Sequence, residues 1–122
     1  MPKKILLVDD DLQLCDEVAE ILRDEGYLVD NTSDENEVES LIRNNDYDLC
    51  LLDYKMPRFT GIDLLKKIKN KNPACIGIIV SGRPFIEKTI QEQNAVALVS
   101  GIIEKPFEIA SVLNKIKELS RG

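Results

Sequence analysis

The sequence predicts an α/β fold, a doubly wound five-stranded parallel sheet with helices on both faces. Five short apolar runs alternate with five longer segments, and regular alternation of strands and helices produces parallel strands joined by right-handed crossovers. Three of the runs are almost continuously apolar, which is typical of strands buried on both faces. The length of 122 residues fits one domain, which we place at residues 1–122.

The apolar runs are the predicted strands. They comprise residues 4–8, 27–30, 49–53, 76–81 and, with a less distinct start, 98–104. Five strands joined by crossover helices favour the order 2-1-3-4-5, a flavodoxin-like three-layer sandwich. In such a sheet the functional site lies beyond the carboxyl ends of the strands, where the strand order reverses. Here that point falls between the first and third strands.

The segments between the runs are the predicted helices. The first has apolar residues at helical spacing from Leu12 to Leu22, and Gly26 ends it. In the second, Asp34 is the predicted N-cap and forms a capping arrangement with Glu37.

The three later helices differ in how strongly the sequence marks them. The third is predicted to begin after the N-cap Thr60 and to end before Pro73. The fourth, near residues 84–93, has few apolar residues, so we expect it to be short or mobile. The last runs from Ile109 to Leu119, and basic residues near its carboxyl end interact favourably with the helix dipole.

Composition excludes several classes of protein. The net charge of −6 argues against nucleic-acid binding by this domain itself. No apolar run approaches the ~20 residues that span a bilayer, and the amino-terminal run is too short for a signal peptide, so we expect no membrane partner and a cytoplasmic location. The absence of histidine excludes Ser-His-Asp triads and the common zinc ligand. Three widely spaced cysteines, Cys15, Cys50 and Cys75, are predicted to be reduced core residues.

Polar residues stand at the carboxyl ends of four predicted strands. They are Asp9, Asp10 and Asp11 after the first, Asp53 at the third, Ser81 at the fourth and Lys105 after the fifth. Each has an ordinary structural alternative, such as helix capping for Asp11, but four strand ends share one edge of the sheet. Crowded carboxylates repel unless a cation joins them, and oxygen ligands without His or Cys suit Mg²⁺. A lysine and a hydroxyl beside that cation would hold a phosphoryl group.

Four stretches occur together in a characteristic order. They are Ile-Leu-Leu-Val-Asp-Asp at 5–10, Leu-Leu-Asp-Tyr-Lys-Met-Pro at 51–57 followed by Gly61, Val-Ser-Gly at 80–82 and Glu-Lys-Pro-Phe at 104–107. In this order they resemble the response-regulator receiver domain over essentially the whole chain. The resemblance implies that Asp53 is the phosphoacceptor, that Ser81 follows the phosphoryl group and that Lys105 pairs with it. The Mg²⁺ ligands it implies are Asp10, Asp53, the backbone carbonyl of Lys55 and, through water, Asp9. It also implies a cis peptide before Pro106.

The resemblance further implies a mechanism and partners. A histidine kinase or phosphotransfer protein would donate a phosphoryl group to Asp53, and the added charge would draw Ser81 and the following loop inward. The face made by the fourth helix, fifth strand and fifth helix would then change its binding of an output domain or downstream protein, or form a homodimer. The chain would be a switch rather than an enzyme, apart from loss of its own phosphoryl group to water.

Three positions depart from the family pattern or vary within it. Ile102 stands where the family usually has an aromatic residue that turns inward, so coupling to the output face is expected to be weaker or built differently. Two basic residues, Lys55 and Arg83, lie two positions after Asp53 and Ser81. Our hypothesis is that one or both screen the phosphoryl group and slow attack by water.

Two alternative functions remain open from the sequence. A haloacid-dehalogenase-type phosphatase would use Asp9 as nucleophile, but no Asp follows Lys105 and the stretch around Asp53 would have no role. A pseudo-receiver used only for docking or dimerisation would explain Ile102, but it has no reason to hold like charges together.

Overall fold

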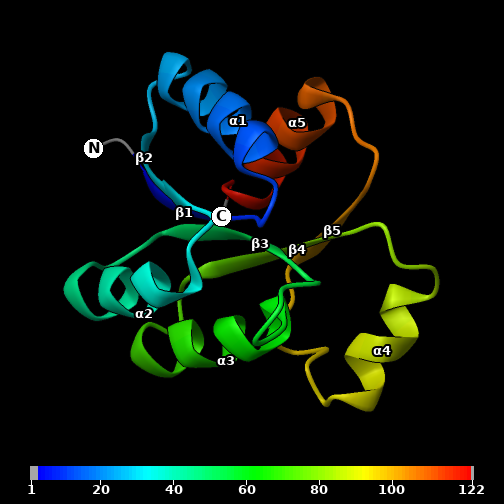
Figure 1. The fold of residues 1–122 in the computed structure, drawn as a ribbon. Helices are drawn as coiled ribbons and strands as arrows, with labels where there is room; N and C mark the ends of the chain where they lie inside the picture. The colour runs from blue at the N-terminus through cyan, green and yellow to red at the C-terminus, as the bar shows by residue number, and fades with distance from the viewer. Residues whose placement is uncertain (1–2, 122) are drawn as a thin grey trace.

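The computed structural model describes residues 3–121, which form one five-stranded sheet with helices on both faces (Figure 1). Its elements in chain order are β1 (Lys4–Val8), α1 (Leu12–Asp24), β2 (Leu28–Thr32), α2 (Glu35–Asn44), β3 (Leu49–Asp53), α3 (Gly61–Lys71), β4 (Ile76–Ser81), α4 (Ile86–Glu92), β5 (Gly101–Glu104) and α5 (Ile109–Leu119). The strand order is β2-β1-β3-β4-β5, and every neighbouring pair is parallel. The predicted fold class and strand order are therefore confirmed. The terminal residues of the predicted domain 1–122 lie outside the described part.

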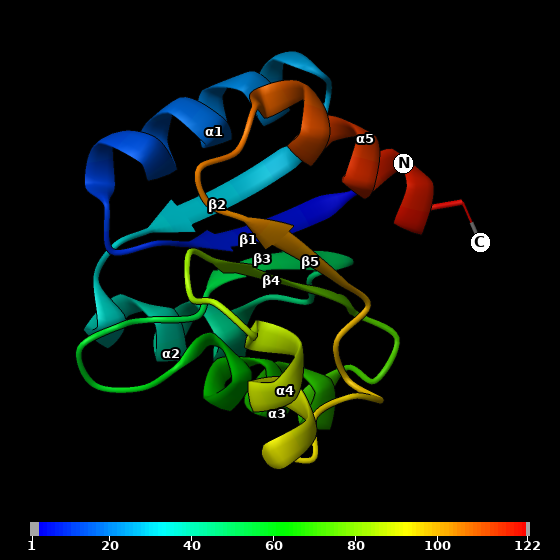
Figure 2. The ribbon, with the colours of Figure 1, turned by 90° about the vertical axis from the view of Figure 1, so that its right-hand side faces the viewer.

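The sheet separates two apolar layers. Helices α1 and α5 cover one face, and α2, α3 and α4 cover the other (Figure 2). All five residues of β3 are buried, which explains why this strand is apolar until its last residue. Burial on both faces orders the central strands, so their carboxyl ends form a firm edge on which a site can be built.

The predicted bounds of two strands were wrong. Strand β2 runs over Leu28–Thr32 rather than 27–30, because the Tyr27 N–H donates to Leu22 O at the end of α1 and so belongs to that turn. Strand β5 begins at Gly101 rather than near 98, because residues 95–99 form a turn in which the N–H groups of Leu98 and Val99 donate to Ala95 O.

Side-chain caps define the beginnings of three helices. The Asp11 carboxylate accepts from Leu14 N and caps α1. Thr60 caps α3 in a reciprocal arrangement with Asp63. The predicted cap at Asp34 is observed through Asn36 N, but the Asp34 N–H donates to the Thr32 hydroxyl at 2.9 Å. The predicted partnership of Asp34 with Glu37 was therefore wrong, because a nearer acceptor on β2 takes that N–H.

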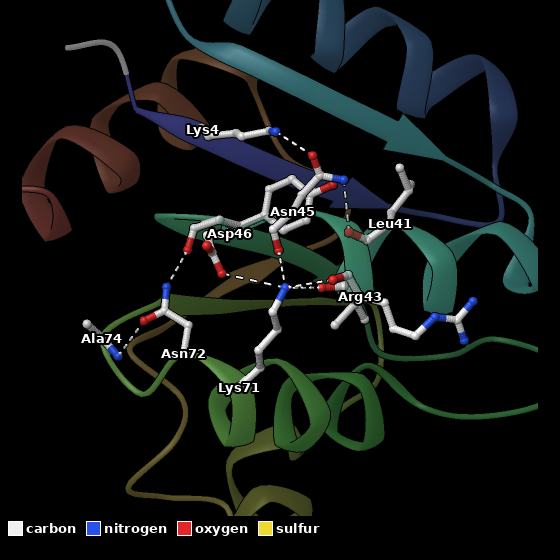
Figure 3. Close-up of polar contacts among 10 residues, drawn as sticks. Lys4, Leu41, Arg43, Asn45, Asp46, Lys71, Asn72 and Ala74 are labelled. Atoms are coloured by element: carbon white, nitrogen blue, oxygen red, sulfur yellow. Dashed lines mark hydrogen bonds and ion pairs between the residues drawn. The ribbon is translucent and has the colours of Figure 1, made fainter.

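A lysine on α3 stabilises the turn at the amino-terminal edge of the sheet (Figure 3). The Lys71 ammonium donates to the carbonyls of Ile42, Arg43 and Asn45 at 2.8, 3.0 and 2.9 Å. The last carbonyls of a helix have no intrahelical partner, and the dipole there favours a cation. Lys71 therefore joins the end of α2 to α3, at the edge opposite the residues that follow β1 and β3.

The three cysteines are free and buried, as predicted. Cys50 and Cys75 lie with their sulfur atoms 3.9 Å apart, and burial raises the pKa of the Cys15 thiol to about 11. No helix within residues 3–121 is long and apolar enough to span a membrane.

Candidate functional site

The carboxyl ends of four strands bring the predicted site residues together. Asp9 follows β1, Asp53 ends β3, Ser81 ends β4 and Lys105 follows β5. Parallel pairing sets Asp53 beside Val80, one residue before Ser81. Asp9, Asp53 and Ser81 are buried, so side chains far apart in the sequence meet in one partly enclosed place.

Lys105 joins the two buried carboxylates. Its ammonium lies 3.0 Å from Asp9 Oδ2 and 3.3 Å from Asp53 Oδ1. The peptide before Pro106 is cis, as the resemblance implied. Burial lowers the pKa of Lys105, but its contacts with Asp9 and Asp53 outweigh burial and the pKa is raised overall. The lysine is therefore charged at neutral pH and partly neutralises the cluster.

A third carboxylate completes the cluster. One oxygen each of Asp9, Asp10 and Asp53 lies within 4.8 Å of the others. Asp10 is exposed, whereas Asp9 is buried and accepts a hydrogen bond from Asp11 N at 3.0 Å. Three hard oxygen ligands with one side open to solvent fit Mg²⁺, which keeps several waters and binds few carboxylates. The loop after β3 also reaches this place, because Lys55 lines the same cleft.

The ionisation of Asp53 reflects this crowding. Burial first, and then the Asp9 charge, raise the pKa of the Asp53 carboxyl to about 7, although Lys105 acts in the opposite direction. A carboxyl group that resists ionisation beside two other carboxyl groups indicates a site where a bound cation would offset their repulsion. This result comes from the tertiary structure, because neither burial nor the Lys105 distance is visible in the sequence.

The loop after β3 is held close to the site by backbone contacts. Tyr54 N donates to Val80 O at 2.8 Å, and Gly61 N donates to Tyr54 O at 3.0 Å. A Cβ at Gly61 would lie 2.6 Å from Asp53 O, so only glycine allows α3 to start this close to the strand. The loop thus returns to the site within seven residues and presents Lys55 at the cleft.

The loop after β4 forms the other wall of the cleft. The Ser81 hydroxyl accepts from Arg83 N at 2.9 Å, and Arg83 and Gly82 line the cleft with Ser81. A hydroxyl can rotate, so Ser81 is able to donate to a group bound beside Asp53. Ile102 is half-buried and packs against the core that α3 and α4 cover.

Sequence reasoning missed the environment of Tyr54. This buried side chain lies under the Arg83 guanidinium, 5.6 Å from the ring centroid, and its hydroxyl accepts from Gln93 Nε2 at 3.1 Å. Its position directly after Asp53 was the only available signal. Gln93 is 39 residues away, beyond the reach of any local pattern.

Comparisons with known proteins agree with this geometry. Residues 5–117 match the protein-family model described as the response regulator receiver domain. The chain is 30% identical over 118 residues to the transcriptional regulatory protein PdtaR of Mycobacterium tuberculosis, covering 96% of this chain and 56% of that protein. The chain spans about half the length of the curated relatives it matches.

Solved structures show the same similarity in three dimensions. A CheY-like response regulator receiver domain protein from Methanospirillum hungatei superposes with a TM-score of 0.85 at 35% identity, over 97% of this chain and 93% of that one. The response regulator TrrA from Thermotoga maritima, solved with Mg²⁺ and a beryllium fluoride, superposes with a TM-score of 0.79 at 25% identity, over 96% and 98% of the two chains.

Proposed function

The chain belongs to the response regulator receiver domain family, and from this premise we propose that it is a phosphorylation switch whose phosphoacceptor is Asp53. The observation that carries the proposal is the position of Lys105, 3.3 Å from Asp53 and 3.0 Å from Asp9, beside a cluster of three carboxylates. Phosphoryl transfer needs a nucleophilic oxygen and positive charge around the transferred group. The Asp53 carboxylate supplies the oxygen, and the cluster holds the Lys105 ammonium beside it.

The metal ligands that we propose are Asp10, Asp53, the Lys55 carbonyl and, through water, Asp9. The oxygen-only donor set fits Mg²⁺. When bound, the ion supplies positive charge to the phosphoryl oxygens. The TrrA structure with Mg²⁺ and beryllium fluoride supports this assignment by similarity.

The chain's own residues perform the transfer in one displacement. An Asp53 Oδ attacks the phosphorus of a phosphohistidine, a new O–P bond forms, and the bond from phosphorus to the imidazole nitrogen breaks. Lys105 then pairs with a phosphoryl oxygen and Ser81 donates a hydrogen bond to another. The reaction requires the ionised carboxylate, so cation binding, which opposes the raised pKa of Asp53, favours it.

The partner of this reaction is a histidine kinase or a phosphotransfer protein. Rotation of Ser81 toward the phosphoryl group breaks its bond to Arg83 N and changes the loop that leads into α4. The resulting population shift alters the α4, β5 and α5 face, which would contact an output domain, a downstream protein or a second copy of the chain. Apart from hydrolysis of its own acyl phosphate, the domain spanning residues 1–122 acts as a signalling switch rather than as an enzyme. Three free thiols fit the reducing cytoplasm.

The test is intact-mass measurement after incubation with Mg²⁺ and acetyl phosphate. We expect the wild type to gain one phosphoryl group and Asp53→Ala to gain none, with chelation of the metal abolishing the gain. Asp24→Ala is the matched control, because Asp24 is exposed and makes no side-chain hydrogen bond or ion pair within the described residues.

Two other results would contradict the proposal. Absence of an adduct on the wild type would favour a docking module without phosphoryl chemistry. Steady phosphate release that survives Asp53→Ala but is lost in Asp9→Ala would favour the phosphatase.

A further inference from the structure

Helix α4 is bounded at both ends by unusual backbone. Phe85 precedes it with φ of 59° and Asn94 follows it with φ of 55°, in the left-handed region that disfavours residues with a Cβ. The helix has seven residues, two of them buried, and no side-chain cap at its start. Few contacts therefore hold α4 in its present place, and those that exist determine how it can move.

One buried side chain contacts the segments on both sides of α4. Tyr54 lies beneath Arg83, which precedes the helix, and accepts a hydrogen bond from Gln93, which follows it. Tyr54 also directly follows Asp53, and its N–H is bonded to β4 at Val80 O. The ring is thus fixed to the phosphoacceptor strand while its face and hydroxyl contact the two ends of the α4 segment.

The contact with Arg83 can be exchanged for another. Within residues 3–121 the guanidinium makes no ion pair, and it is exposed at the rim of the cleft that contains Asp53. A phosphoryl group on Asp53 carries about −2 charge. A cation over an aromatic ring, by contrast, is held only weakly at an exposed site. The same event draws away the Ser81 oxygen that now accepts from Arg83 N. Both contacts that hold Arg83 over Tyr54 therefore weaken together.

We infer that Tyr54 is a positioning residue that couples phosphorylation of Asp53 to α4, through Arg83 at the start of the helix and Gln93 at its end. This inference rests on the proposed phosphorylation of Asp53. It gives the chain a route to its α4 face that does not require an aromatic side chain at position 102, where the structure has Ile102 half-buried. In this route the start of α4 is released while its end stays hydrogen-bonded to Tyr54, so the helix pivots about Gln93.

The experiment compares amide NMR spectra of the 122-residue chain with Mg²⁺, before and after saturation with beryllium trifluoride, an analogue of the phosphoryl group. In the wild type we expect shifts both near Asp9, Ser81 and Lys105 and along α4. In Tyr54→Phe and in Gln93→Met, the α4 shifts should fall to less than half their wild-type size, and the double variant should lose no more than either single one. In Gln93→Met the shifts at the strand ends should persist.

Matched variants separate coupling from a merely structural effect. Gln93→Glu should retain the wild-type α4 response, because the Tyr54 hydroxyl can donate to the new carboxylate. Gln91→Met, the same substitution on an exposed residue of α4, and Tyr27→Phe should also leave the response at full size. The inference is overturned if the α4 amide resonances shift to the full wild-type extent in both Tyr54→Phe and Gln93→Met. It is also overturned if Gln91→Met reduces the α4 response as much as Gln93→Met does. A wild type that shows no shift at the strand ends overturns the proposed function, and this inference with it.

Discussion

Replacing Asp53 with asparagine should make the metal-free protein more stable at alkaline pH. Burial and the Asp9 charge raise the pKa of Asp53 from its ordinary value of 3.8 to about 7 in the folded protein. The folded state therefore binds more protons than the unfolded state between these two values, so the free energy of unfolding falls as pH rises from about 4 to about 7. The difference between the two pKa values corresponds to a loss of about 4 kcal/mol in the free energy of unfolding.

The stabilisation that we expect to measure for Asp53→Asn is somewhat smaller. The cleft admits solvent beside exposed Asp10, so we expect Asp53→Asn to gain ~2–4 kcal/mol at pH 8 and little below pH 4. Lys105 keeps Asp9 as an ion-pair partner at 3.0 Å in this variant, so its charge is not left unpaired. A gain of this size raises the midpoint of thermal unfolding by roughly 10 °C in a domain of this length.

The assay is urea unfolding followed by far-UV circular dichroism from pH 4 to pH 9, with a chelator present. The chain has no tryptophan, so dichroism is the better probe. Asp24→Asn is the matched control and should follow the wild-type curve within a few tenths of a kcal/mol. Addition of Mg²⁺ at pH 8 should stabilise the wild type more than Asp53→Asn, because a ligand that binds only the folded state adds its binding free energy. Parallel pH curves for the wild type and Asp53→Asn would contradict the raised pKa of Asp53.

Three further substitutions test other parts of the site. Lys105→Met should lower the rate of phosphoryl uptake from acetyl phosphate at least tenfold, because a preorganised positive charge is lost; an unchanged rate by intact mass would show that this lysine has no part in transfer. Gly61→Ala should cost ~1–3 kcal/mol in urea unfolding, because the new Cβ would lie 2.6 Å from Asp53 O, and a wild-type midpoint would contradict the close approach. The double change Lys55→Ala, Arg83→Ala should shorten the lifetime of the phosphoryl group severalfold, measured by its decay in intact-mass spectra after the donor is removed; equal lifetimes would exclude screening by these cations.

Local sequence patterns were sufficient to predict the layout of the fold and most of the site. Alternation of apolar runs with helical segments predicted the strand order, and polar residues at the ends of those runs predicted that Asp9, Asp53, Ser81 and Lys105 would meet, which they do. Both inferences succeed because they depend on periodicity and on the parallel direction of strands, which local sequence encodes. The cap at Thr60 was predictable because an N-cap side chain bonds to a backbone N–H only two or three residues further along the chain.

Contacts between residues far apart in the chain became visible only in the packed structure. The Tyr54 hydroxyl accepts a hydrogen bond from Gln93, 39 residues away. The raised pKa of Asp53 likewise depends on burial and on neighbours from other strands. Local patterns rank the conformations of a segment, but hydrogen-bond partners and electrostatic environments depend on distances that exist only after the layers have packed.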